Sequence, residues 1–75
     1  MKHEAAVKAF GEHLKRIRAE RGISQQELAD MANVAKQTVY RIENGHFAVT
    51  LDVLFALSEG LEIPLKELMD FPVNS

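Results

Sequence analysis

The sequence predicts an all-α domain of five helices. Apolar residues recur at helical spacing along nearly all of the chain, and no stretch alternates as a strand would. The 75 residues suit one small domain over 1–75, and 27% charged residues with 4 Gly and 2 Pro exclude disordered and fibrous classes. The predicted helices span about 4–21, 24–32, 36–44, 50–61 and 64–70, with a tail at 71–75.

The first helix is predicted by an apolar stripe that a glycine terminates. Gly22 follows a basic last turn, as is typical of a helix end. Ser24 and Glu27 then form the pattern of a capping box, which predicts the start of the second helix. The residues of the stripe follow the spacing i, i+3, i+7 and i+10: Val7, Phe10, Leu14 and Ile17.

The second and third helices are separated by only about three residues, so they must cross steeply. A small residue is needed where they touch, and Ala29 fits this position. The turn favours a residue that tolerates positive φ, and Asn33 is one of the few such types besides glycine. Val39 and Ile42 mark the inner side of the third helix, which Asn44 and the following glycine end.

The fourth and fifth helices also carry start signals. Thr50 is the predicted N-cap of the fourth helix, with Asp52 in its first turn. Pro64 suits the first position of the fifth helix. The residues expected to face inward are Leu51, Leu54, Leu57 and Leu61 in the fourth helix and Leu65, Leu68 and Met69 in the fifth.

The outer face of the third helix is rich in hydrogen-bonding groups. Taken alone, such a face is more often a solvated surface than a binding site. However, two short helices joined by a tight turn, the second with a bare polar face, form the layout of a helix-turn-helix, in which the second helix enters the DNA major groove. The side chains on this face are Lys36, Gln37, Tyr40, Arg41 and Asn44.

Several motifs in register resemble the XRE/Cro-type helix-turn-helix of phage repressors and bacterial regulators. The resemblance covers about residues 10–71 and implies a five-helix, lambda-repressor-like fold. Each motif alone is weak, but all of them in order make a specific match. They are ISQQELA at 23–29, NV at 33–34, TVYRIENG at 38–45, TLDVL at 50–54 and IPLKEL at 63–68.

The resemblance implies roles for individual positions. Base contacts fall to Lys36, Gln37 and Arg41, while a structural ion pair falls to Arg18 and Glu43. Backbone or flanking contacts fall to Gln25, Thr38, Tyr40, Asn44, Gly45, His46 and Phe47. The chain departs from the family at Ala35, where relatives have a capping Ser or Thr, and at Glu62, where many have Gly or Asn; both departures concern local geometry.

One such module offers a small footprint on DNA, which favours a homodimer that reads two half-sites of a pseudo-palindromic operator. We expect the candidate interface to consist of Phe55, Met69, Phe71 and Val73, against the alternative that these aromatic residues pack late in the core or are singly exposed. The predicted partners are therefore double-stranded operator DNA and a second copy of the chain.

Other classes of function find no support in the sequence. With no cysteine, and with His3, His13 and His46 at spacings unlike any zinc pattern, we expect no metal site. There is no phosphate-binding glycine loop or nucleophile elbow, so we expect no enzymatic activity and no cofactor. We also expect no small-molecule ligand, because the sequence shows no ligand-binding domain. No signal peptide or membrane span is recognisable, which predicts a cytoplasmic protein, and the family resemblance implies a bacterial or phage origin.

The net charge of −2 appears unfavourable for binding DNA, but the charge is unevenly distributed. Residues 1–47 hold eight basic and six acidic side chains, whereas residues 48–75 hold one and five. We therefore expect a transcriptional regulator, a repressor, with a basic DNA-reading half and an acidic half turned away. The alternatives are an antitoxin, a restriction-modification controller, or a protein-interaction module of the same fold that has lost DNA binding.

Overall fold

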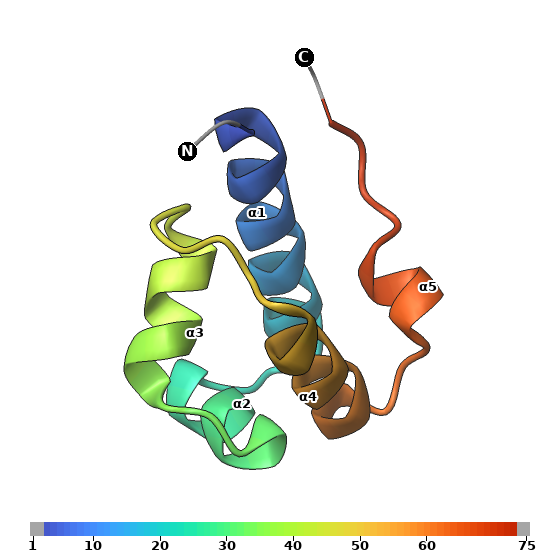
Figure 1. Cartoon of the computed structure of the whole chain (residues 1–75). Helices are drawn as coiled ribbons and strands as arrows, with labels where there is room; N and C mark the ends of the chain where they lie inside the picture. Colours follow the sequence, from blue (N-terminus) through green and yellow to red (C-terminus); the bar gives the residue numbers. More distant parts are fainter. Residues whose placement is uncertain (1–2, 74–75) are drawn as a thin grey trace.

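The computed structural model describes residues 3–73, which contain five α-helices and no strand. The predicted all-α class is therefore confirmed, and the helices follow one another in Figure 1. Residues 1–2 of the predicted domain and 74–75 of the predicted tail lie outside the described range. The helices are α1 (Glu4–Glu20), α2 (Gln25–Ala32), α3 (Lys36–Glu43), α4 (Leu51–Leu61) and α5 (Leu65–Leu68).

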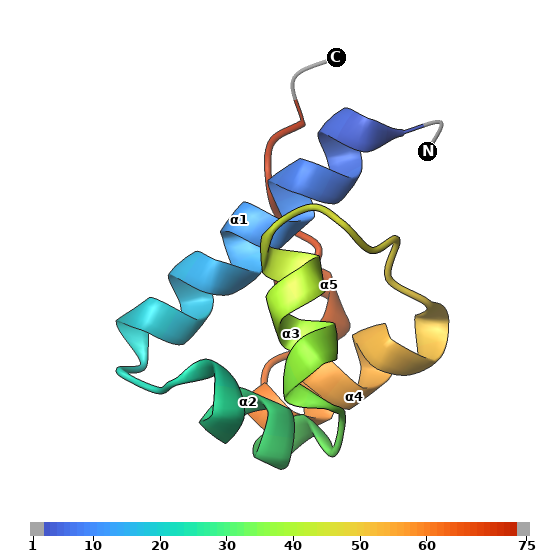
Figure 2. The same cartoon turned by 90° about the vertical axis from the view of Figure 1, so that its left-hand side faces the viewer.

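Helix α3 packs against both α1 and α2, while α2 also packs against α4. The short helix α5 contacts α4. Figure 2 shows α3 on the surface in front of this assembly, with α2 crossing below it. One apolar cluster, to which every helix contributes, fixes α3 in place while leaving its outer face free. Its buried members are Phe10, Leu14, Leu28, Ala29, Ala32, Val39, Ile42, Leu57, Leu61 and Leu68.

Two glycines permit the closest helix contacts. A Cβ atom on Gly11 of α1 would overlap the carbonyl oxygen of Ile42 in α3. A Cβ atom on Gly60 of α4 would lie 2.8 Å from the carbonyl oxygen of Met31 in α2. Because the opposing atoms belong to the backbone, no rotation of a side chain could make room for either Cβ.

The first four helices end in the same way, with a residue of positive φ just after the helix. In each case the amides of that residue and of its successor donate to carbonyls of the last turn, as in the Schellman motif. At the end of α4, for example, the amides of Glu62 and Ile63 donate to the carbonyls of Glu59 and Ser58. The four residues and their φ angles are Gly22 (65°), Asn33 (57°), Gly45 (72°) and Glu62 (57°).

Glu62 is the one of these four whose residue type is poorly suited to the left-handed conformation. Replacing it with glycine should stabilise the domain by about 0.5–1 kcal/mol, because relief of the left-handed strain exceeds the extra entropy of an unfolded glycine. The melting temperature should rise by about 2–8 °C for a domain of this size. Glu62→Gln keeps the backbone constraint and removes only the charge, so an equal rise in that variant would contradict the explanation.

The structure corrects three expectations about the last two helices. Leu51 does not face inward: it is 64% exposed, because at 3.6 residues per turn it lies about 120° around α4 from the buried Leu57. Helix α5 is shorter than expected, and Pro64 is its N-cap rather than its first residue. Met69 lies just beyond α5 and is 44% exposed, so the prediction that it faces the core is wrong.

Phe71 in the tail packs within its own chain. Its ring centroid lies 5.7 Å from that of Phe10 and 5.5 Å from that of His13. The His13 Nε2 atom also donates to the carbonyl oxygen of Glu67, at 3.3 Å. These contacts hold the tail against α1, so Phe71 is half-buried as part of the fold.

Candidate nucleic-acid interface

The polar face of α3 is continuous and exposed. Successive residues turn by about 100° around a helix, so the five polar positions occupy an arc of about 140°. Val39 and Ile42 occupy the opposite side and are buried, and Glu43, which lies about 20° beyond Lys36, is buried as well. Thr38 lies at the edge and is half-exposed. The five exposed side chains are Lys36, Gln37, Tyr40, Arg41 and Asn44.

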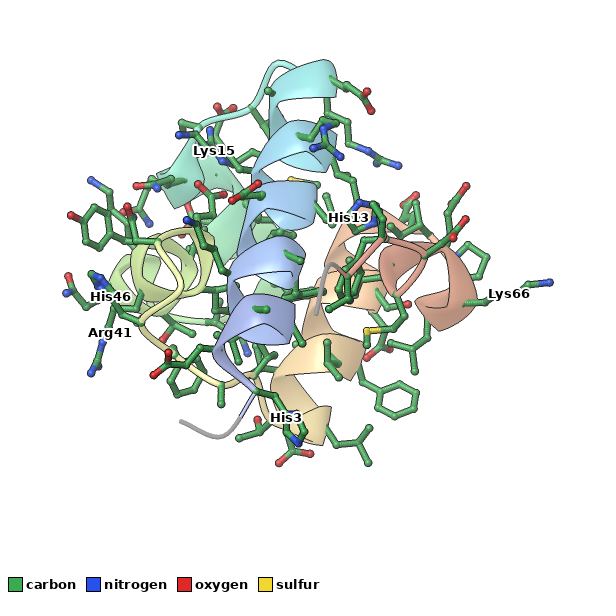
Figure 3. The ribbon with its side chains drawn as sticks, turned by 90° about the horizontal axis from the view of Figure 1, so that it is seen from above. His3, His13, Lys15, Arg41, His46 and Lys66 are labelled. Carbon is green, nitrogen blue, oxygen red and sulfur yellow. The ribbon has the colours of Figure 1, made fainter. Side chains whose placement is uncertain are left out.

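The loop that follows α3 extends this surface. His46 is exposed, whereas Gly45 and Phe47 are half-buried. Figure 3 shows Arg41 and His46 on the same side of the molecule, opposite Lys66 on α5. Arg41 and His46 thus share one side of the molecule, whereas Phe47 packs against the core and the candidate dimer residues lie on or after α4 and α5.

The geometry of the turn between α2 and α3 agrees with the sequence. Asn33 has a left-handed conformation, and its successor Val34 donates from its amide to the carbonyl of Ala29 at 2.9 Å. Ala29, the small residue expected between the two helices, is fully buried. Ala35 is the N-cap of α3 and provides no side-chain hydrogen bond, so the first turn of α3 keeps unpaired backbone donors directed to solvent.

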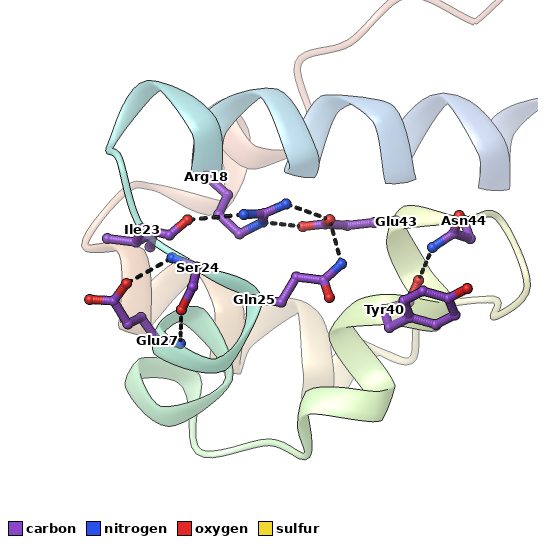
Figure 4. A network of polar contacts seen from close by, with 8 residues as sticks. All are labelled: Arg18, Ile23, Ser24, Gln25, Glu27, Tyr40, Glu43 and Asn44. Atoms are coloured by element: carbon purple, nitrogen blue, oxygen red, sulfur yellow. Dashed lines mark hydrogen bonds and ion pairs between the residues drawn. The ribbon is translucent and has the colours of Figure 1, made fainter.

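A buried carboxylate connects three helices behind the exposed face. Glu43 is 1% exposed in its side chain and accepts two hydrogen bonds from Arg18, one from Nε at 2.7 Å and one from Nη2 at 3.0 Å. Arg18 also donates to the carbonyl of Ile23, and Gln25 donates from Nε2 to Glu43 Oε1 at 3.0 Å (Figure 4). The expected ion pair is present, and it holds α1, the start of α2 and the end of α3 together.

The electrostatics of this network stabilise its charged form. The hydrogen bond from Arg18 to Glu43 raises the pKa of the guanidinium above its ordinary value, against the opposing effect of burial. A raised pKa means that this contribution is fully present below the pKa of an unfolded arginine and is lost only above the raised value. Arg18 therefore stays charged well into the alkaline range, and its contribution to the pair is not lost near neutral pH.

The amides of two predicted phosphate contacts already have partners within the chain. Gln25 donates to Glu43, and Asn44 donates from Nδ2 to the carbonyl oxygen of Tyr40 at 2.8 Å, as Figure 4 shows. Each amide nitrogen carries a second hydrogen, so each side chain can still donate to a ligand. The sequence did not indicate either bond, because both depend on how the helices are placed and turned.

The structure also shows where other polar groups lie. The three histidines lie far apart in Figure 3, and residues 3–73 contain no group of His, Cys, Asp or Glu side chains that could hold a metal ion. Within the same range, no helix has both the length and the apolar character needed to cross a bilayer.

A helix-turn-helix family profile matches residues 14–68, which include α2, α3 and the whole of α4. The chain belongs to the XRE-type helix-turn-helix family. This family consists of DNA-binding transcriptional regulators, and the resemblance seen in the sequence motifs is confirmed.

Relatives of this helix-turn-helix chain occur in archaea and bacteria. A Pyrococcus furiosus protein described as an HTH-type transcriptional regulatory protein is 38% identical over 64 residues, which are 85% of this chain and 20% of that protein. The Bacillus subtilis repressor RghR is 36% identical over 64 residues, 84% of this chain and 47% of RghR. The chain thus spans about a fifth of the length of its archaeal relatives and about half that of RghR.

Solved structures show the same fold. The restriction-modification controller protein C.AhdI of Aeromonas hydrophila superposes with a TM-score of 0.78 at 33% identity, covering 84% of this chain and 94% of the controller. The clp gene regulator ClgR of C. glutamicum superposes with a TM-score of 0.79 at 23% identity, covering 85% of this chain and 82% of ClgR. At 23% identity, the similarity to ClgR shows a shared fold and nothing more.

Proposed function

We propose that this chain binds double-stranded DNA in a sequence-specific manner, with α3 in the major groove, and acts as a transcriptional repressor. The observation that carries the proposal is the bare polar face of α3, which the pair of Arg18 and Glu43 ties to α1 and the hydrogen bond from Gln25 ties to the start of α2. A major groove about 12 Å wide admits one α-helix, and base edges are read by side chains near the start of that helix.

Each residue of the surface has chemistry that suits a particular contact. Gln37 can form a bidentate pair with adenine, and Lys36 or Arg41 can donate to guanine O6 and N7. Backbone amides at a helix N-terminus suit phosphate, which supports a phosphate contact by Gln25. The remaining contacts to sugar or phosphate are assigned to Thr38, Tyr40, Asn44, Gly45, His46 and Phe47.

Substitution of the reading residues should change which DNA sequences are bound. In a selection from a random duplex pool, Gln37→Ala and Arg41→Ala should each lose preference at one base position, because one good pair contributes about 1–3 kcal/mol of discrimination. The fold, followed by circular dichroism, should not change. Lys66→Ala is the matched control, since it removes an exposed charge on the opposite side of the molecule and should leave the selected sequence intact.

Two outcomes would count against this assignment. If Gln37→Ala and Arg41→Ala both selected the wild-type sequence, the reading face would lie elsewhere. If the wild-type chain shifted no duplex DNA at low salt, and the double variant Lys36→Glu/Arg41→Glu behaved identically, a protein-interaction module would explain the fold better.

The charge distribution supports moderate, salt-sensitive affinity. The acidic side chains of residues 48–75 are confined to α4, α5 and the residues next to them, and Figure 1 shows α5 on the side of α1 away from α3. Residues 1–47, which include α3, hold eight basic side chains against six acidic ones, so few positive charges are available to neutralise phosphates. Non-specific binding should therefore be weak, and specificity should depend on a few side chains.

The proposed active form is a homodimer on a pseudo-palindromic operator. Three of the four candidate interface residues are exposed, Phe55 by 49%, Met69 by 44% and Val73 by 47%. Large apolar side chains exposed to this degree support a protein contact. Phe71 is already packed on Phe10 and His13, so its part in the interface is to support the surface from behind.

Placing a charge in this surface should separate the dimer. Phe55→Asp should shift the sedimentation coefficient to that of a monomer and weaken binding to a two-half-site operator far more than to a single half-site, because the two modules no longer bind as one unit. Met31→Asp is the control, since Met31 is an apolar residue of similar exposure on α2. Equal dimerisation of Phe55→Asp and wild type would place the interface on another face.

A second candidate role is control of a restriction-modification operon. The likeness to C.AhdI supports it, since the superposition covers nearly all of that controller at 33% identity. Restriction and methyltransferase genes beside the gene for this chain, with the selected DNA site upstream of them, would favour this role over that of a general repressor. An adjacent toxin gene would instead favour an antitoxin.

A further inference from the structure

The hydrogen bond between Gln25 and Glu43 is not needed to neutralise charge. Arg18 already makes two charge-assisted bonds to the Glu43 carboxylate and thereby compensates its buried charge. Gln25 adds a third, neutral donor to Oε1 at 3.0 Å. The structural effect of this third bond is to fix the direction of a long side chain at the first position of α2.

The capping of α2 leaves two backbone donors beside this side chain. The Ser24 amide donates to Glu27 Oε1, and the Glu27 amide donates to Ser24 Oγ. The amides of Gln25 and Gln26 have no partner of their own within residues 3–73. The second amide hydrogen of the Gln25 side chain is also unused, because its single hydrogen bond is the one to Glu43.

We propose that Glu43 is a positioning residue for DNA: it orients the Gln25 amide so that the side chain and the first two amides of α2 can donate to one phosphate. This inference rests on the proposed DNA binding. Glu43 is buried and touches no phosphate itself. It acts through Gln25, and Arg18 cancels the negative charge that would otherwise repel the phosphate.

The advantage lies in ordering a flexible side chain before DNA arrives. A free glutamine must give up rotamer freedom on binding, which lowers affinity, whereas Gln25 is already held by Glu43 in the free protein. Loss of this preorganisation should weaken binding to each half-site about 3- to 10-fold, the range expected for one rotamer-rich side chain. The effect should be confined to a single phosphate on each half-site.

The test uses the double variant Arg18→Met/Glu43→Met, since a buried ion pair can be replaced by apolar side chains of similar size without loss of the fold. The dissociation constant is measured on the selected duplex and on duplexes with one phosphate at a time replaced by an uncharged methylphosphonate. The penalty of a phosphate is the loss of affinity that its replacement causes. The phosphate that contacts Gln25 is identified as the one whose penalty falls most between wild type and Gln25→Ala.

At that phosphate, the double variant should show a penalty reduced toward that of Gln25→Ala, while penalties at other phosphates remain. Adding Gln25→Ala to the double variant should weaken binding less than Gln25→Ala does in wild type. A folded double variant that keeps the full penalty would overturn the inference. So would a Gln25→Ala variant with unchanged penalties at every phosphate. Both results leave base selection by Gln37 and Arg41 intact, whereas failure of the proposed function would abolish specific binding in wild type.

A second measurement needs no variant. In the free wild-type protein, ¹⁵N relaxation should show the Gln25 side-chain amide as rigid as the helix backbone. The exposed Gln37, whose side chain makes no hydrogen bond in the described structure, is the internal control and should be mobile. Equal mobility of the two side chains would contradict positioning by Glu43.

Discussion

Gly11→Ala should destabilise the domain by about 3 kcal/mol or more, at the upper end of what overpacking costs. The added methyl group would overlap the Ile42 carbonyl oxygen and lie 3.2 Å from the carbonyl carbon and oxygen of Glu43. All three atoms belong to the α3 backbone, so α1 and α3 would have to move apart. That movement would strain the hydrogen bonds of Arg18 to Glu43 and displace α3.

The destabilisation expected for Gly11→Ala is a large part of the domain's free energy of unfolding. A domain of this length has a free energy of unfolding of about 4–11 kcal/mol. Urea denaturation followed by circular dichroism should show a lower midpoint for Gly11→Ala. Ala19→Gly, the reverse change at an exposed position of the same helix, is the control and should cost about 1 kcal/mol through helix propensity alone.

Helix propensity makes the sign of the result decisive. In an open position, glycine to alanine within a helix would stabilise the protein by about 1 kcal/mol. A Gly11→Ala variant as stable as wild type would therefore mean that α1 and α3 can separate at little cost. Gly60→Ala tests the equivalent contact of α4 with α2, where the new Cβ would lie 2.8–2.9 Å from backbone atoms of Met31 and Ala32.

The sequence predicted the helices well because their ends carry local signals. The capping box of Ser24 and Glu27 and the capping of α4 by Thr50 are both present in the structure. Asn33 also adopts the positive φ that was expected of it. Such signals act over four residues or fewer, so they can be recognised without knowledge of the tertiary structure.

Contacts between distant segments could not be predicted in the same way. The approach of Gly11 to Ile42 depends on how α1 and α3 cross, which no local pattern encodes. Leu51 shared the spacing of the core leucines, but its position around the helix turns it toward solvent. For the candidate site, the exposed face of α3 followed from periodicity, whereas the bond from Gln25 to Glu43 required the arrangement of two helices.

Arg18→Met should destabilise the domain by about 3–5 kcal/mol, since it leaves a buried carboxylate without its counterion. Glu43 is 1% exposed in its side chain, and after the substitution only the neutral amide of Gln25 would remain as its partner. The charged carboxylate would then have to be hydrated or protonated, and either change would disturb the packing of α3 on α1.

Adding Glu43→Met to this variant should restore much of the lost stability, because the unpaired charge is then removed and two apolar side chains can pack together. Urea denaturation of wild type, both single variants and the double variant gives the coupling between the two positions. Strong coupling would show that Arg18→Met destabilises the domain because the buried Glu43 carboxylate loses its counterion, and not because packing is lost. If the double variant were as unstable as the two single losses combined, the ion pair itself would be what holds α1 against α3, and apolar contacts could not replace it.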